Sequence, residues 1–146
     1  MATNPVASAN DNDEDNYYGS SSEVSGNAQA HEFFFVLLQA AVIAHELHLN
    51  TRSIAEHLAL DELYKELPGL TDDLIETYQG KYGLVMNYPT AVKMPDHNDA
   101  LSLVKNLAAY IQISRGQVAP DTYLQNQIDE IEKLIYSVLN KLKFYS

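Results

Sequence analysis

The 146-residue chain contains no cysteine and no tryptophan. Without cysteine there can be no disulfide, no thiolate zinc site and no cysteine nucleophile. Basic residues are also few, since nine Lys and Arg stand against twenty Asp and Glu, for a net charge of −11. Because DNA or RNA binding requires a basic patch that displaces counterions from phosphates, we expect no nucleic-acid partner. An acidic surface favours solubility, cation attraction or a basic protein partner.

Long hydrophobic runs are absent as well. The longest apolar stretch covers residues 33–44 and is interrupted by Gln39, whereas a membrane span needs about 20 apolar residues. The N-terminus has no basic segment followed by an apolar one, so we predict no secretory signal. We therefore expect no membrane partner and a cytoplasmic location.

The first part of the chain differs in composition from the rest. Residues 1–28 are rich in Asn, Ser, Gly, Asp and Glu and have almost no apolar content. Such a segment buries too little apolar surface to offset the entropy of ordering. We predict an acidic tail over residues 1–28, disordered or ordered by an assembly in which a protein partner binds it. Residues 29–146 are expected to form one folded domain.

Four segments of this domain have apolar residues at spacings of three and four, which is typical of helices packed on one side. The first is expected over about residues 29–49. The second begins at Ser53, which forms a capping-box pattern with Glu56. A third helix should be capped by Asn98 or Asp99, after a long connector over residues 80–98.

The third helix is expected to end at Arg115-Gly116, and the fourth to start at Pro120-Asp121. The fourth has the clearest apolar stripe, formed by Leu124, Ile128, Ile131, Leu134, Ile135, Val138 and Leu142. No segment alternates with period two. The predicted fold class is all-α, a four-helix bundle.

The second helix contains Pro68-Gly69. Proline inside a helix removes a backbone hydrogen bond and clashes with the preceding turn, at a cost of about 3 kcal/mol. The helix therefore either kinks here or stops and restarts near Thr71, and Gly80 is its expected end.

Five potential metal ligands lie on the first and second helices. They are His45 on the first helix and, on the second, His57, Asp61, Asp72 and Glu76. His57 and Asp61 are four residues apart, as are Asp72 and Glu76, and eleven residues separate Asp61 from Asp72. On one unbroken helix these last four would share a face, because eleven residues make about three turns. Imidazole and carboxylate ligands within reach of one another suit divalent iron.

One straight helix cannot bring both pairs to the same ion. At 1.5 Å per residue, the two pairs lie about 22 Å apart. In two helices packed antiparallel about a two-fold axis, the first pair of one copy meets the second pair of the other, and two equal sites form. A metal site built from these residues therefore predicts at least a dimer.

The stretch from His45 to Glu76 resembles the Dps mini-ferritins, which are ferritin-like bundles that oxidise and store iron. In that family a His near the end of the first helix is followed by a His, an Asp, a second Asp and a Glu at the same spacings, and this sequence matches them without a gap. The helix from Asp121 to Leu142 is also similar to the last helix of the family.

The resemblance implies a ferritin-like four-helix bundle and an iron site between two-fold-related subunits. There Fe(II) would be oxidised by peroxide or oxygen, and twelve subunits would enclose the mineral. Asp61 and Glu76 would be the main carboxylate ligands, and the other three would complete or hydrogen-bond the sites. No catalytic residue beyond these metal ligands is expected.

Alternatives follow from the same residues. Tyr78-Gln79-Gly80-Lys81-Tyr82-Gly83 looks more like the small Dps-like proteins of tailed bacteriophages than like bacterial Dps. The chain could therefore be a structural or assembly protein of a phage virion that keeps a ferritin-like fold without catalysis. His57 and Asp61 could equally be an exposed i,i+4 pair, and His45 and His48 could lie at the edge of the core.

Overall fold

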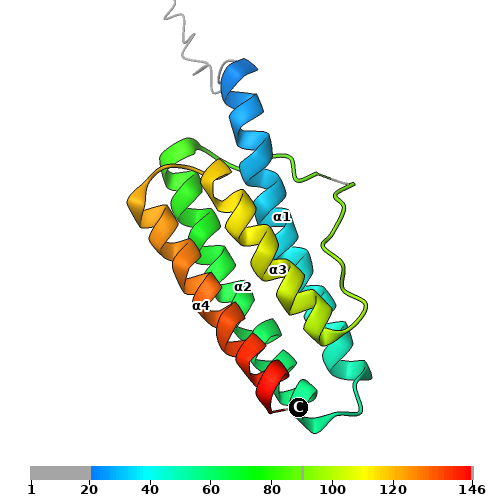
Figure 1. Ribbon diagram of the computed structural model, residues 1–146. Helices are drawn as coiled ribbons and strands as arrows, with labels where there is room; N and C mark the ends of the chain where they lie inside the picture. Colours follow the sequence, from blue (N-terminus) through cyan, green and yellow to red (C-terminus); the bar gives the residue numbers. More distant parts are fainter. Residues whose placement is uncertain (1–20, 90, 146) are drawn as a thin grey trace, which may run out of the picture.

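A computed structural model describes residues 21–89 and 91–145, and no strand occurs among them (Figure 1). The elements are α1 (Ser21–Asn50), α2 (Ile54–Tyr82), α3 (Ala100–Ser114), the short 3-10 helix η1 (Arg115–Gln117) and α4 (Thr122–Phe144). The prediction of an all-α domain with four helices is confirmed.

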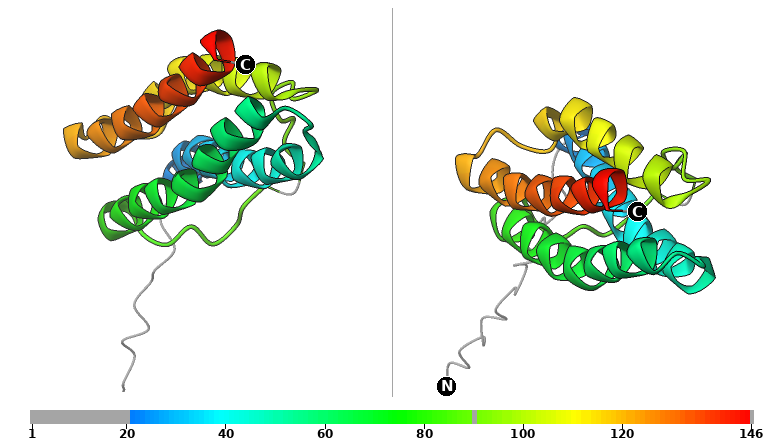
Figure 2. Two further views of the ribbon diagram at one scale, coloured as in Figure 1. Left: turned by 90° about the horizontal axis from the view of Figure 1, so that it is seen from below. Right: turned by 60° about the horizontal axis from the view of Figure 1, so that its bottom comes forward.

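The four helices surround one hydrophobic core. α1 packs on α2, α2 on α4, α4 on α3, and α3 on α1, so each helix has two neighbours (Figure 2). Phe33, Leu63, Leu107 and Ile128 are fully buried in this core, one from each helix. All seven residues of the stripe expected on α4 are buried. Its periodicity located the core side of that helix correctly.

The predicted caps are present, with one change. The hydroxyl of Ser53 accepts a hydrogen bond from the backbone N–H of Glu56 at 3.3 Å, and Asp99 accepts one from Ser102 at 2.7 Å. The Glu56 carboxylate does not close the capping box on Ser53. It accepts a hydrogen bond from the Thr51 hydroxyl at 2.6 Å, which in turn accepts from the Ser53 N–H at 3.1 Å.

α1 begins at Ser21, eight residues before the start expected from periodicity. Residues 21–28 have no apolar pattern to detect, but they also contain no proline. Extending a helix that already exists is easier than nucleating one, so the polar turns can follow the packed part. The acidic tail predicted over residues 1–28 otherwise lies outside the described residues.

α2 continues through Pro68-Gly69 and ends at Tyr82, two residues beyond the expected stop. Leu67 and Leu74 lie on either side of Pro68, and both are fully buried in the same core. A buried leucine contributes about 1.5–3 kcal/mol, so these two side chains together offset the cost of an internal proline. Gly83 ends the helix with a φ of 98°.

α1 extends beyond the apolar run of residues 33–44, which was too short to predict a membrane span. By length and composition alone, Ala28–Asn50 could cross a membrane. Its fully buried side chains, which include Phe33, Leu37 and Ala44, pack in the core with residues of the other three helices. Packing in the core thus accounts for the 39% of this stretch that is buried.

Candidate metal centre

The turn at residues 51–53 sets the last turn of α1 against the first turn of α2. Here the imidazole of His48 is buried and stacks on that of His57, with ring centroids 3.8 Å apart and planes 24° from parallel. The stack lies beneath the corner at which the two helices meet.

Two reciprocal hydrogen bonds fix these rings. His48 Nδ1 lies 2.9 Å from the carbonyl oxygen of His57, and His57 Nδ1 lies 3.1 Å from the carbonyl oxygen of His48. A carbonyl oxygen only accepts, so each Nδ1 carries the proton, and the neutral ring keeps its lone pair on Nε2. Histidines that bind metals are commonly held in this way through their second ring nitrogen.

Asp61 is the carboxylate next to this pair. Its Oδ1 lies 3.9 Å from His48 Nε2, and Lys65 Nζ lies 2.8 Å from Oδ1 and 2.9 Å from Oδ2. The hydrogen bond from Lys65 lowers the pKa of Asp61, and a hydrogen bond from the Tyr64 hydroxyl lowers it further. Asp61 is therefore an anion over the whole neutral range, as a metal ligand must be.

His45 takes a different position from the one its sequence spacing suggests. Its exposed ring stacks on Tyr64, with centroids 4.1 Å apart and planes 8° from parallel, and its centroid is 6.1 Å from that of His48. With metal–nitrogen bonds of about 2.1 Å, the centroids of two rings on one ion lie up to about 6.5 Å apart. The separation of His45 and His48 is within this limit, whereas stacked rings such as those of His48 and His57 do not direct their nitrogens at one ion.

Asp72 and Glu76 lie farther along α2, and both are exposed. Because α2 is continuous, its wheel of 100° per residue applies from end to end. Asp61, Asp72 and Glu76 then fall within about 60° of one another. The connector reaches the same part of the helix, since burial, and to a smaller extent the charge of Asp72, raises the pKa of Tyr88.

Within the described part of one chain, no three His, Asp or Glu side chains come close enough together to hold a metal ion. The structure brings His57 and Asp61 beside His48, sets His45 on Tyr64, and leaves the acidic pair at the far end of α2. A single chain thus presents two partial ligand sets, one where α1 meets α2 and one farther along α2.

Sequence reasoning missed three residues of this centre: His48, Tyr64 and Lys65. His48 lies in the core stripe of α1, which concealed its pairing with a residue nine positions later across the turn. Lys65 was detectable, because it follows Asp61 by four residues, a spacing at which helical side chains meet.

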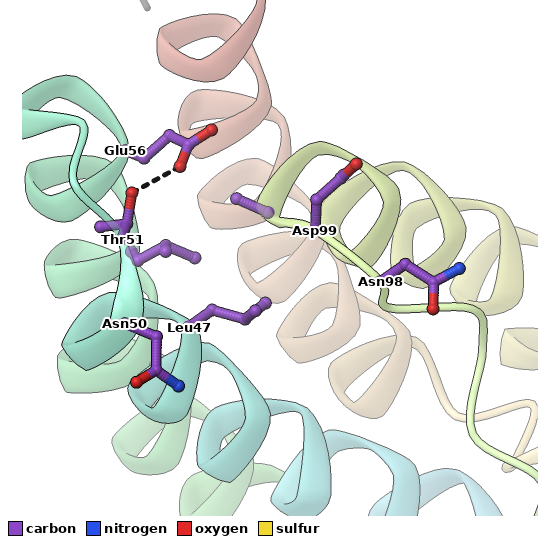
Figure 3. A pocket seen from close by; sticks show the side chains of 8 residues that line it. Leu47, Asn50, Thr51, Glu56, Asn98 and Asp99 are labelled. Atoms are coloured by element: carbon purple, nitrogen blue, oxygen red, sulfur yellow. Dashed lines mark hydrogen bonds between the residues drawn. The ribbon is translucent and has the colours of Figure 1, made fainter.

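A separate small pocket lies on the inner side of the same turn (Figure 3). Its volume is about 150 Å³, and its lining includes Leu47, Thr51, Glu56, Asn98 and Asp99. None of the five predicted ligands lines it. The pocket is therefore distinct from the histidine centre.

Comparison with known proteins finds a similar protein in a bacteriophage. It is 29% identical over 111 residues to an uncharacterized 14.6 kDa protein in the mobD-ri intergenic region of Enterobacteria phage T4, covering 75% of this chain and 84% of that protein. No solved structure matches the chain. A family profile matches residues 48–142, which include His48, His57, Asp61, Asp72 and Glu76 but not His45. The chain belongs to this family, the family of unknown function DUF5856.

Proposed function

We propose that the protein binds Fe(II) and oxidises it at centres shared between two copies of a ferritin-like bundle. The observation that carries this proposal is the pair of reciprocal hydrogen bonds between His48 and His57. They hold both rings in place, and the Nε2 of His48 lies 3.9 Å from the ionised carboxylate of Asp61. Imidazole and carboxylate are the ligands that non-haem iron takes.

The outer face of α1 and α2 supports a second copy as the source of the remaining ligands. Leu49, Ile54 and Leu58 are 68%, 72% and 62% exposed, and they lie at the hairpin end of this face. The far end of the face carries Asp72 and Glu76. In an antiparallel pair, apolar surface is buried and each acidic end meets the histidines of the other copy.

For the oxidation of Fe(II), the main task of the protein is to hold the ions where the oxidant can reach them. Two Fe(II) ions each give one electron to hydrogen peroxide, which takes up two protons and leaves as two water molecules. Imidazole and carboxylate ligands hold the ions and leave positions open for the oxidant. The full negative charge of Asp61 favours the Fe(III) product, since it interacts more strongly with the higher charge.

The proposal is tested by mixing the purified protein with Fe(II) and hydrogen peroxide and following oxidation by absorbance. We expect the His57→Ala/Asp61→Ala variant to oxidise iron at least about tenfold more slowly, the loss typical of damage to a metal site. Glu130→Ala is the matched control, because Glu130 is an exposed carboxylate on α4 rather than on α1 or α2. Equal rates in the wild type and the double variant would contradict the proposal.

A second candidate is favoured by the phage T4 relative. A ferritin-like bundle without catalysis could serve as a structural or assembly component of a phage particle. It predicts that the protein co-purifies with particles and that the double variant assembles as well as the wild type. A soluble, isolated shell of twelve subunits that takes up iron would argue against it.

A further inference from the structure

The ammonium group of Lys65 already occupies the carboxylate of the histidine centre. Lys65 Nζ lies 2.8 Å from one oxygen of Asp61 and 2.9 Å from the other, so it is centred between the two. This is the position that a cation bound by both oxygens would take. His48 Nε2 lies on the same side, 3.9 Å from Oδ1.

We propose that Lys65 is an internal cation that a divalent metal ion must displace from Asp61. The inference rests on the proposed function, since it concerns how the same centre accepts its ion. A metal at Asp61 and His48 needs the oxygen that the ammonium now holds, and two positive charges at one carboxylate repel each other. Lys65 therefore weakens metal binding and keeps Asp61 paired until an ion arrives.

The lysine is placed to leave without unfolding the helix. Its side chain is 59% exposed, and ion pairs with such exposure contribute little to stability. Its nitrogen is already 5.8 Å from the centre of the Tyr64 ring, a distance at which an ammonium is attracted to an aromatic face. The Tyr64 ring and the solvent therefore both offer the displaced ammonium group a favourable environment.

The test is a titration of the full-length protein with Co(II), which does not oxidise under these conditions and reports its ligands by absorbance. We expect Lys65→Met to lower the Kd by about two- to fivefold, the range that an exposed ion pair corresponds to. Lys65→Arg keeps the positive charge beside Asp61 and is expected to bind no more tightly than the wild type.

Lys133→Met is the matched control. Lys133 is 73% exposed, lies on α4 and pairs with Glu130 at 3.4 Å, so its loss changes the net charge equally but far from the centre. An unchanged or raised Kd in Lys65→Met, or an equal fall in Lys133→Met, would overturn the inference while leaving the proposed function standing. If Co(II) and Fe(II) fail to bind the wild type and every variant, both proposals fail.

Discussion

Tyr110 shows how burial controls a single side chain in this bundle. Its ring is half-buried and stacks on Phe33, with centroids 5.9 Å apart. Burial raises the pKa of Tyr110 to about 12, and the charge of Glu32 acts in the same direction. The folded protein therefore holds the neutral phenol at a pH where an unfolded chain would release the proton.

This shift predicts how stability depends on alkaline pH. An unfolded tyrosine has a pKa of about 10, so the contribution of Tyr110 is complete below that pH. It is lost as the pH rises toward the folded value of about 12. In urea unfolding between pH 9 and pH 11.5, we expect Tyr110→Phe to lose stability less steeply than the wild type. Tyr145→Phe, at a 73% exposed position, is the control; parallel curves for all three proteins would contradict the assignment.

For single residues, the sequence correctly predicts contacts between groups that lie close together in the chain. Ser53 and Asp99 cap their helices as expected, because a cap needs only a side-chain oxygen and an N–H three residues later. The contacts of His45 with Tyr64 and of His48 with His57 depend on how α1 packs against α2. Spacing alone could suggest ligand types but not which rings meet.

Among the helices, α2 shows that tertiary packing can outweigh the preference of a single residue against helix. Pro68 was expected to kink or stop the helix, but α2 continues from Ile54 to Tyr82. Burial of leucines on both sides of the proline decided this outcome, and tertiary packing of this kind cannot be read from a window of sequence. The continuity of α2 places Asp61, Asp72 and Glu76 on one face, which the sequence left open.

Two glycines, one inside α2 and one at its C-terminal cap, should have opposite effects on stability when replaced by alanine. Gly69 is an exposed helical position where an added methyl group meets nothing within 4 Å, so we expect Gly69→Ala to raise the free energy of unfolding by about 0.5–1 kcal/mol. Gly83 is equally open but has a φ of 98°. Gly83→Ala should lower stability by about 1–2 kcal/mol, since a side chain strains that conformation. Urea denaturation measures both, and stabilisation by both substitutions would contradict this account.

At the scale of the whole molecule, the outer face of α1 and α2 carries most of the functional proposal. The fold class could be predicted from the sequence because four apolar stripes need one shared core. The assembly could not be predicted from the sequence, because a single chain shows which groups are exposed but not which of them contact another copy. Leu49, Ile54 and Leu58 are exposed at the ends of α1 and α2 that the turn joins, and clusters of exposed apolar side chains mark contacts between proteins.

If two copies pair through this face, a single charged substitution in it should prevent the pairing. Leu58 is 62% exposed in the single chain, so Leu58→Asp should fold normally yet place a desolvated charge in the proposed contact. We expect sedimentation to show a dimer or larger assembly for the wild type and a monomer for this variant. Ile113→Asp, on a 79% exposed side chain of α3, is the control. A wild type that sediments as a monomer would contradict the proposed pairing.

The crossed hydrogen bonds of His48 and His57 have one more consequence, which concerns entropy. Each ring is fixed by a main-chain carbonyl and by the face of the other ring. Their rotational freedom is therefore lost when the chain folds rather than when an ion binds, and immobilising a flexible side chain on binding typically costs about 0.5–1.5 kcal/mol. An incoming ion meets donors whose directions are already set, so coordination geometry, more than charge, should decide which ions remain bound.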